Sequence, residues 1–474
     1  MLLNRRWDAI VVGAGPNGLA AAVTIAQAGK SVLVLEAQAT PGGGSRTAES
    51  TLPGFRHDVC SAVHPLGVAS PVFRRLGISD AVEWVYPEVE LAHPLDGGHA
   101  GALYRSIDAT AAGLGRDGVS WQNLFTPLVS DLPRLTPLLL GPFRLPRHPI
   151  AAARFGLRAL RSVRGLAHAH FQDDTARALF AGMAAHAMLR LEQPASAAFG
   201  LVLGAFAHAV GWPVARGGSQ AIIDALTTKL REHGGEIVLN QPVVSLDDLP
   251  ESRVVLLDVT PRQALAIGAR RFPAYYRRQL GRFRYGPGVC KVDWALSAPV
   301  PWQAPAARKA ITLHLGGTLD EISRAEIEVH HGHIPEQPYV LISQPTIYDA
   351  TRAPAGRHTL WAYCHVPAHA DEDMSERIEA QIERFAPGFR ERILARNVLT
   401  AIDMQEYNAN YIGGDINGGI QDLRQVFTRP TPRRTPYITG AKGIYLCSSS
   451  TPPGGGVHGM CGYHAARLAL RDLR

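Results

Sequence analysis

A glycine-rich turn between two apolar segments constrains the fold of this chain more than any other part of its sequence. An apolar run at 9–12 leads into the turn GAGPNG at 13–18, which opens a helix of small residues at 19–27, and a second apolar run follows at 31–35. Short apolar runs bounded by turn signals are typical of buried parallel strands. We therefore predict a β-α-β unit at the start of an α/β fold with a parallel sheet.

The three glycines of this turn meet three separate requirements of dinucleotide binding. Gly13 permits the tight turn, Gly15 lets the main chain approach a pyrophosphate, and Gly18 lets the helix lie close to the strand. The N–H groups at the start of the helix are free to bind phosphate oxygens. Glu36 follows about twenty residues later, where an acidic side chain accepts hydrogen bonds from the ribose hydroxyls.

A second glycine turn directly after this acid favours FAD over a nicotinamide dinucleotide. Pro41 ends the preceding segment, and Gly42–Gly44 form another stretch of exposed main chain. A nicotinamide-binding domain has no evident use for a further glycine loop at this point, whereas the ribityl chain and ring of FAD need more main-chain contacts. No second β-α-β unit with a GxGxxG turn follows in the sequence, which disfavours a reductase with its own NAD(P)H domain.

We expect three later segments to extend the same parallel sheet. Residues 236–239 follow a helical stripe, residues 253–261 form a buried run stopped by a proline, and residues 443–446 precede the last glycine-rich turn. The nucleotide domain is then discontinuous in sequence. The expected division is an FAD-binding domain of residues 1–70, 211–289 and 425–474, with a second, α+β substrate-binding domain of residues 71–210 and 290–424.

Several stretches spread along the chain resemble the phytoene desaturase-type flavoproteins, the phytoene dehydrogenase-related branch of the amine oxidase-like FAD superfamily. They include VVGAGPNGLAAA, EAQATPGGGSRT, YGPGVCKVDWAL, RAPAGRHTLWAYCHVP and YLCSSSTPPGGGVHGMCGYHAA. The resemblance implies a Rossmann-like FAD-binding domain and oxidation of a substrate C–H bond with FAD as cofactor. The FAD contacts that it implies are Gly13, Gly15, Pro16, Asn17, Gly18, Glu36, Ala37, Gly43, Gly44, Ser45, Val243, Gly455, Val457, His458, Gly459 and Met460.

The resemblance also gives a role to the glycine-rich stretch near the carboxyl end of the chain. Gly454–Gly456 lets the main chain pass close to the flavin ring, and a helix that begins at Gly459 directs its first N–H groups at the N1 and C2 region of the ring. The positive end of a helix dipole there favours the anionic reduced flavin. His458 lies at the junction, where two roles stay open: contact with flavin or substrate, or capping of the helix.

Three residues are candidates for catalysis, each with a structural alternative. Lys291 lies in the alternating run VCKVDWAL, and related flavoproteins often hold a lysine near flavin N5; the alternative is a surface lysine on an edge strand. His64 is a candidate acid–base group or a hydrogen-bonded structural histidine. His458 is the third candidate. No grouping of His, Cys, Asp and Glu has the spacing of metal ligands, so we predict no metal site.

Composition and charge argue against several other classes of protein. The five cysteines are scattered without a C-x-x-C pair, which argues against a disulfide framework or a zinc ribbon. The formal net charge is +7, but no basic cluster interleaved with aromatic residues indicates nucleic-acid binding. The first residues lack the apolar core of a signal peptide, and no apolar stretch approaches the ~20 residues that span a bilayer. We expect a cytoplasmic protein, with peripheral membrane contact as one option.

The membrane option depends on residues 132–171, which contain repeated arginines and no acidic residue. Within them Leu157, Leu160, Val163 and Ala167 recur at helical spacing, with arginines to one side. Such a helix either lies on an anionic membrane or packs on its own domain. Membrane contact would suit an apolar substrate that partitions into lipid.

Three functions stay open for the chain. The expected one is an FAD-dependent dehydrogenase, desaturase or oxidase that removes hydride from an apolar, isoprenoid-like or polyketide-like molecule and passes electrons to dioxygen or a quinone. The second is an amine oxidase-like enzyme, which needs an aromatic cage for a neutral amine, with Trp212, Trp294 and Tyr463 as candidates. The third is a flavin-dependent isomerase or a non-catalytic flavin-bearing interaction protein.

Overall fold

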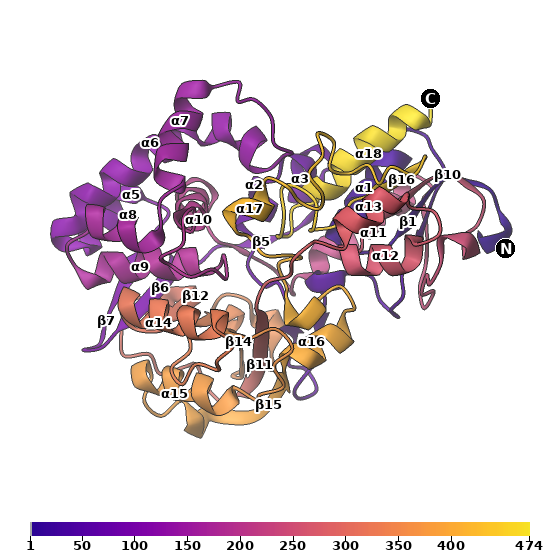
Figure 1. Ribbon diagram of the computed structural model, residues 1–474. Helices are drawn as coiled ribbons and strands as arrows, with labels where there is room; N and C mark the ends of the chain where they lie inside the picture. Colours follow the sequence, from indigo (N-terminus) through magenta and orange to yellow (C-terminus); the bar gives the residue numbers. More distant parts are fainter. Residues whose placement is uncertain (1) are drawn as a thin grey trace.

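Two β-sheets organise the structure, a computed structural model that describes residues 2–474 (Figure 1). The first sheet has five parallel strands, which confirms the predicted α/β class with a Rossmann-like parallel sheet. In spatial order the strands are β16 (Ile444–Leu446), β10 (Ser252–Leu257), β1 (Trp7–Val12), β2 (Val32–Leu35) and β9 (Glu236–Val238).

Helices cover both faces of this first sheet, which is why its central strands are apolar at nearly every position. Helices α1 (Pro16–Ala26), α11 (Gln220–Glu232) and α18 (Met460–Asp472) pack together on one face. Helices α12 (Pro261–Gly268) and α13 (Ala274–Leu280) cover the other face. Both ends of the described chain lie in this unit (Figure 1).

The strand order reverses direction between β1 and β10, because the chain builds β2 and β9 on one side of β1 and then returns to build β10 and β16 on the other. Ligands of open α/β sheets bind at such a switch point, outside the carboxyl ends of the strands. Gly13 directly follows β1 and Asp258 directly follows β10. The fold therefore predicts a ligand site between these two residues.

The second sheet has seven strands, all antiparallel to their neighbours except for the β6–β12 pair. In spatial order they are β15 (Ile393–Leu399), β11 (Gly288–Leu296), β14 (His358–Val366), β13 (Val340–Ser343), β12 (Ala310–Leu315), β6 (Val89–Leu95) and β7 (His99–Leu103). Two short ribbons complete the β-structure: β3 (Thr47–Ala48) with β4 (His57–Asp58), and β5 (Trp84–Val85) with β8 (Val214–Ala215).

The two faces of the second sheet differ in chemistry because side chains alternate along β11 and β14. On one face Val292 and Trp294 join an apolar core with α15 (Ser375–Phe385). On the other face Lys291 and Asp293 meet residues of the segment that follows the second glycine turn. The polar face of this sheet is thus turned toward the predicted cofactor site.

A group of helices stands beside the second sheet and forms the purple and magenta part of Figure 1, with α7 at its upper edge. These helices are α5 (Ile107–Gly113), α6 (Gly118–Leu139), α7 (Pro149–Ala159), α8 (Val163–His170), α9 (Asp174–Ala185) and α10 (Ala197–Val210). The other α-helices of the described chain that have not yet been named are α2 (Pro65–Ala69), α3 (Pro71–Arg75), α4 (Ile78–Ala81), α14 (Leu319–His330), α16 (Ala401–Tyr407) and α17 (Leu423–Val426). No helix within residues 2–474 is both long and apolar enough to cross a membrane.

The expected helical stripe of residues 157–167 is divided between two helices. Ser162 accepts a hydrogen bond from the N–H of Gly165 and so begins α8 as its N-cap, after α7 has ended. Leu157 and Leu160 are exposed, whereas Val163 and Ala167 are buried. The apolar positions therefore have two destinations, the surface and the core.

The strands of the two sheets come from separate parts of the chain, and the predicted domain boundaries remain a prediction. The first sheet draws its strands from 7–35, 236–257 and 444–446, and the second from 89–103 and 288–399. Helices α3 and α4, which follow residue 70, pack against α18 and α11 of the first unit.

Candidate functional site

The first glycine turn brings three segments into main-chain contact. Gly13 has φ +100°, a conformation that favours glycine. A Cβ on Gly18 would collide with the carbonyl oxygen of Gly13, so only glycine allows α1 to start this close to β1. Gly15, the N-cap of α1, has no side chain with which to cap the helix, and the N–H of Gly18 in the first turn donates to Asp258 Oδ2 at 2.8 Å. The positive end of the helix faces the switch point of the sheet.

Glu36, at the end of β2, holds the first turn from the side. Its Oε2 accepts a hydrogen bond from the N–H of Ala14 at 2.8 Å, and its Oε1 accepts one from the N–H of Gln38 at 3.0 Å. The guanidinium of Arg46 lies 3.3 Å from the same carboxylate, and both side chains are buried. Sequence reasoning missed Arg46, although it lies inside the quoted motif EAQATPGGGSRT, because an arginine there reads as a solvated loop residue.

The second glycine turn packs directly on the first. The N–H of Gly42 donates to the carbonyl oxygen of Ala14 at 2.9 Å, and a Cβ on Gly43 would lie 3.2 Å from the Cα of Gly15. Two buried polar atoms beside these turns, Asn17 Oδ1 and Ser45 Oγ, have no hydrogen-bond partner within the protein. Their presence here fits a site that a dinucleotide completes.

The carboxyl end of the chain returns to the same place. Gly462 of α18 lies so close to the carbonyl oxygen of Asn17 that a Cβ could not be added to it. Gly459, the N-cap of α18, has φ +67°, and a Cβ on it would lie 2.8 Å from the Cβ of Ala20. The two glycine-rich ends of the sequence are therefore packed against each other, as the predicted cofactor site requires.

His458 occupies the turn before α18 in a buried, capping position. Its Nδ1 accepts a hydrogen bond from the N–H of Met460 at 3.1 Å, and its carbonyl oxygen accepts one from Ser70 Oγ at 2.6 Å. Burial lowers the pKa of His458 to about 4, so the ring is neutral near pH 7. Of the two roles left open by the sequence, this geometry is that of a helix cap.

Helix α2 connects the C-terminal turn to His64, which stands at its N-terminus. A Cβ on Gly67 of α2 would lie 3.1 Å from the carbonyl oxygen of Val457. His64 Nε2 is 2.8 Å from Ser219 Oγ, and burial lowers the pKa of His64 to about 4. His64 is therefore a neutral, hydrogen-bonded histidine beside the C-terminal turn.

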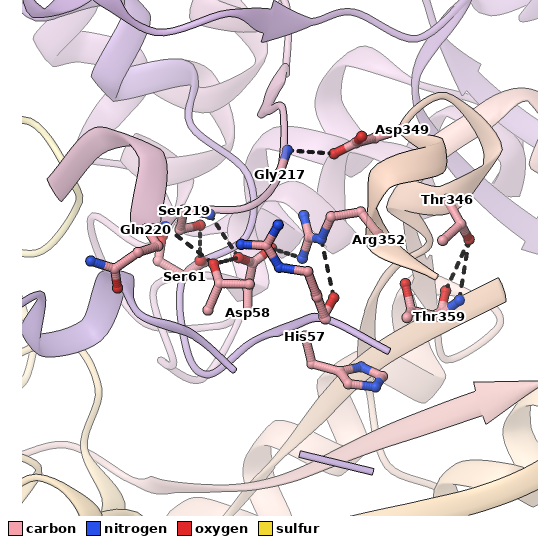
Figure 2. A network of polar contacts seen from close by, with 12 residues as sticks. His57, Asp58, Ser61, Gly217, Ser219, Gln220, Thr346, Asp349, Arg352 and Thr359 are labelled. Atoms are coloured by element: carbon pink, nitrogen blue, oxygen red, sulfur yellow. Dashed lines mark hydrogen bonds and ion pairs between the residues drawn. The ribbon is translucent and has the colours of Figure 1, made fainter. Parts of the chain in front are cut away.

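A network of polar contacts centred on Asp58 fixes the segment that contains His57 and Ser61 (Figure 2). The carboxylate of Asp58 accepts hydrogen bonds from Thr47 Oγ1 at 2.8 Å, from the N–H of Ser219 at 2.8 Å and from Arg352 Nη2 at 2.7 Å. Burial acts to raise its pKa, but Arg352 and these hydrogen bonds outweigh burial and lower it. Asp58 is thus a buried anion that joins the second glycine turn to α11 and to the loop of Arg352.

Lys291 is buried on β11 and does not lie on a protein surface. Its Nζ is 2.5 Å from Asp293 Oδ2, which also accepts a hydrogen bond from Ser50 Oγ at 2.9 Å. His57 Nδ1 lies 3.6 Å from the other oxygen of Asp293, and burial lowers the pKa of His57 to about 4. The structure therefore places Lys291 in an ion pair next to the segment that links the second glycine turn to His64.

Aromatic side chains flank this ion pair on the neighbouring strand β14. Tyr363 pairs in register with Lys291, and the rings of Trp361 and Tyr363 are perpendicular with centroids 5.3 Å apart. The residues that the sequence suggested for an aromatic cage do not meet. Trp294 lies on the opposite face of the sheet and donates to Glu379, while Trp212 packs against His186.

The remaining predicted contacts lie at the edges of the site. Gln241 donates its N–H to the carbonyl oxygen of Glu36 at 2.8 Å, which brings the half-buried Val243 into the neighbourhood of Glu36. A Cβ on Gly455 would lie 3.0 Å from the carbonyl oxygen of Asn417, a residue that the sequence did not single out. Within residues 2–474 no cluster of His, Cys, Asp and Glu has the arrangement of a metal site.

Comparison with known proteins gives the fold and the site a context. Residues 11–76 match the family described as an NAD(P)-binding Rossmann-like domain. The chain is 26% identical to pyridine nucleotide-disulfide oxidoreductase domain-containing protein 2 of Rattus norvegicus, over 100% of this chain and 94% of the relative. It is 24% identical to the neurosporene-forming phytoene desaturase of Rhodobacter capsulatus, over 96% of this chain and 92% of the relative.

Solved structures share the fold over nearly the whole chain. An oxidoreductase from Methanosarcina mazei superimposes with a TM-score of 0.66 at 17% identity, covering 98% of this chain and 100% of that one. Cyclohexylamine oxidase from Brevibacterium oxydans superimposes with a TM-score of 0.61 at 16% identity, covering 98% of each chain. The similarity to a phytoene desaturase confirms the resemblance stated from the sequence, and the solved structures share the fold.

Proposed function

We propose that this chain is an FAD-dependent oxidoreductase of the amine oxidase and desaturase superfamily, and that it oxidises a C–H bond of an apolar substrate that it takes from a lipid surface. The observation that carries this proposal is an exposed surface of apolar and arginine side chains beside the C-terminal helix. The name of the relative from Rhodobacter capsulatus, a phytoene desaturase, supports an isoprenoid-like substrate.

This surface, which we call the α7 surface, is formed by α7, the loop before it and α17. Leu145 is 90% exposed and Leu157 is 77% exposed. Exposed apolar residues that lie together mark an interaction surface. Phe143 and Phe427 are also exposed and meet edge to face at 5.3 Å. The remaining exposed apolar members are Ile150, Leu160, Leu423 and Val426.

The charge of the α7 surface complements an anionic lipid headgroup layer. Arg144 and Arg147 are exposed within the apolar loop, and Arg154 follows on α7. The only acidic partner that the described contacts give to these three arginines is Asp131, which lies 3.0 Å from Arg154. Apolar side chains flanked by arginines are the composition of interfacial membrane-binding segments.

The α7 surface adjoins the carboxyl-terminal part of the candidate site. A Cβ on Gly141, just before the exposed loop, would lie 3.6 Å from His464 Nε2 on α18. The positive charge of Arg144 acts to lower the pKa of both His464 and Tyr437. A substrate that leaves a lipid layer at this surface would thus enter the protein next to the helix that begins at the C-terminal glycine turn.

The residues of the site have distinct tasks in this proposal. When bound, FAD supplies the acceptor for the two electrons of the oxidised C–H bond. The N-termini of α1 and α18 bring positive dipole ends to the pyrophosphate and ring parts of the cofactor site. Lys291, held by Asp293, presents a buried cation on the polar face of the second sheet. His64 and His458 are neutral and maintain the turns around the ring part of the site.

We propose dioxygen or a quinone as the electron acceptor, because the chain carries one dinucleotide-binding unit.

The test is anaerobic reduction of the bound flavin by candidate substrates, measured as the loss of the flavin's visible absorbance. Isoprenoid hydrocarbons are presented in anionic vesicles, and the same compounds are presented in detergent micelles as a comparison. We expect bleaching with at least one hydrocarbon and faster bleaching from vesicles. Flavin that stays oxidised with every hydrocarbon but is bleached by a water-soluble amine would overturn the proposal.

Amine oxidation is the second candidate, and the perpendicular pair Trp361 and Tyr363 beside Lys291 favours it. Aromatic faces stabilise a substrate amine next to a flavin. Release of hydrogen peroxide with a panel of mono- and polyamines, in the absence of lipid, would favour this candidate over the first.

A further inference from the structure

Asp258 stands at the switch point of the parallel sheet, directly opposite the first glycine turn. It follows β10 as Gly13 follows β1, and its N–H donates to the carbonyl oxygen of Val12 at 2.8 Å. The predicted buried run at 253–261 includes this residue, but no pattern in the sequence assigned it a role. The pairing of β1 with β10 is what brings it to the cofactor site.

The side chain of Asp258 lies beneath all three glycines of the turn. Its Oδ2 accepts a hydrogen bond from the N–H of Gly18 at 2.8 Å. A Cβ on Gly15 would lie 2.9 Å from the same oxygen, and one on Gly13 would lie 3.2 Å from the Cβ of Asp258. Asp258 and the turn therefore fit together only because these three positions lack side chains.

Asp258 is not completely buried. The residue keeps partial exposure, as do Gly13, Gly15 and Pro16 across from it, while Asn17 and Gly18 behind them are buried. These partly exposed residues line the carboxyl edge of β1 and β10, where the pyrophosphate of a dinucleotide lies in this fold. The carboxyl of Asp258 consequently faces the place where two further negative charges arrive.

We propose that FAD binding to this protein is coupled to a proton on Asp258, so that the cofactor binds with Asp258 in the neutral form and is held more weakly as the pH rises. The proposal rests on FAD being the cofactor and is independent of the substrate and of the α7 surface.

The groups around Asp258 support a neutral carboxyl. Glu36 at the end of β2, Cys447 after β16 and Cys461 on α18 are titratable groups whose electrostatic influence extends to Asp258. None of these three brings a positive charge, and the guanidinium of Arg46 pairs with Glu36. Burial and, to a lesser degree, the charge of Glu36 raise the pKa of Asp258 to about 7, against a lowering by the Gly18 hydrogen bond. The negative pyrophosphate acts in the same direction as Glu36.

The sign of the effect follows from linkage. The pyrophosphate raises the pKa of Asp258 further, so the complex retains a proton that the free protein loses above about pH 7. The dissociation constant of FAD should then be constant below about pH 6 and rise by up to tenfold per pH unit above about pH 7. The nearby histidines His57, His64 and His458 titrate near pH 4 and do not contribute in this window.

The experiment measures FAD dissociation from the purified holoprotein by flavin fluorescence on serial dilution, between about pH 6 and about pH 8.5. The Asp258→Asn variant keeps the shape of the side chain and an acceptor oxygen for Gly18 but cannot ionise. We expect its dissociation constant to match that of the wild type near pH 6, to be flat with pH, and to be about tenfold lower than the wild-type value near pH 8.

Asp8→Asn is the matched control, because Asp8 lies at the amino edge of the same sheet. There it pairs with Ser31, away from the first glycine turn. We expect this variant to keep the full wild-type pH dependence. A wild-type dissociation constant that does not change with pH would overturn the proposal, as would an equal slope in Asp258→Asn. If Asp258→Asn does not fold, the wild-type protein still decides the question. Calorimetry of FAD binding near pH 8, in two buffers of different ionisation enthalpy, should give an uptake of up to one proton, and an uptake of zero would refute the coupling.

Discussion

Gly462 of the last helix lies against the carbonyl oxygen of Asn17 in the first helix, with no room for a side chain between them. This contact joins the two glycine-rich ends of the sequence. Gly459 makes a similar approach to Ala20 one turn earlier. The relation between α1 and α18 therefore sets the distance between the phosphate part and the ring part of the cofactor site.

Substitution of Gly462 by valine should separate α18 from α1. A side chain at this contact overpacks a well-packed interface, at a cost of about 1–3 kcal/mol in the free energy of unfolding. We expect a lower melting temperature and a lower FAD content per chain, measured by thermal unfolding and by the absorbance of released flavin. Gly156→Ala in α7 is the control, because a Cβ there meets nothing within 4 Å, and it should lower neither quantity. Normal FAD content in Gly462→Val would show that the contact does not organise the site.

The Lys291–Asp293 pair allows its structural and chemical roles to be separated. Lys291→Met leaves a buried carboxylate unpaired, which costs roughly 3–5 kcal/mol in unfolding free energy. The double variant Lys291→Met/Asp293→Asn removes both charges and should recover much of this loss. If Lys291 also assists the reaction, flavin reduction by substrate stays slower in the double variant by roughly 10²-fold or more, measured by stopped-flow absorbance. Recovery of the wild-type rate together with stability would assign Lys291 a structural role only.

Buried neutral histidines make the stability of the protein depend on pH. The folded-state pKa of His64, about 4, lies below its ordinary value of 6.5, so its contribution is fully present above pH 6.5 and is lost as the pH falls from there toward 4. Replacing His64 with glutamine should reduce the slope of unfolding free energy in this range by up to about 1.4 kcal/mol per pH unit. Chemical denaturation at several pH values measures the slope. His233→Gln, at an exposed position, should not change it, and an unchanged slope in His64→Gln would contradict the assignment.

The α7 surface should bind anionic vesicles through both its apolar and its basic residues. The double variant Leu145→Asp/Leu157→Asp places charges at two of its most exposed leucines, and we expect co-sedimentation with phosphatidylserine vesicles to fall at least tenfold. Wild-type binding should also weaken with added salt, because screening reduces the attraction of exposed arginines. Val119→Asp, on an exposed residue at the other end of α6, is the matched control and should bind as the wild type does. Equal binding by all three proteins would exclude this surface as the docking face.

The parts of the fold that were predictable from sequence depend on local patterns. The β1–α1–β2 unit follows from apolar runs and a glycine turn within about 30 residues, which is the usual span of a βαβ unit. The strands β9, β10 and β16 were predictable for the same reason, because each is a short apolar run ended by a turn.

The residues that sequence reasoning missed act through partners far away in the chain. Asp58 and Arg352 meet only because the second sheet packs on the segment after the second glycine turn. Asp258 reaches Gly18 only because β10 pairs with β1. The division of the stripe at 157–167 was visible in principle, since Ser162 is a good N-cap residue, but helical periodicity alone continues through it.

The central claim is that the glycine turns at 13–18, 42–44 and 454–456 together bind one FAD. The most direct measurement is the visible spectrum of the purified protein, with the flavin released by denaturation, identified by mass and counted per chain. The account predicts a yellow protein with one non-covalent FAD per chain, and loss of that flavin in a Gly15→Val variant. A colourless protein that takes up no FAD when the cofactor is added would contradict it.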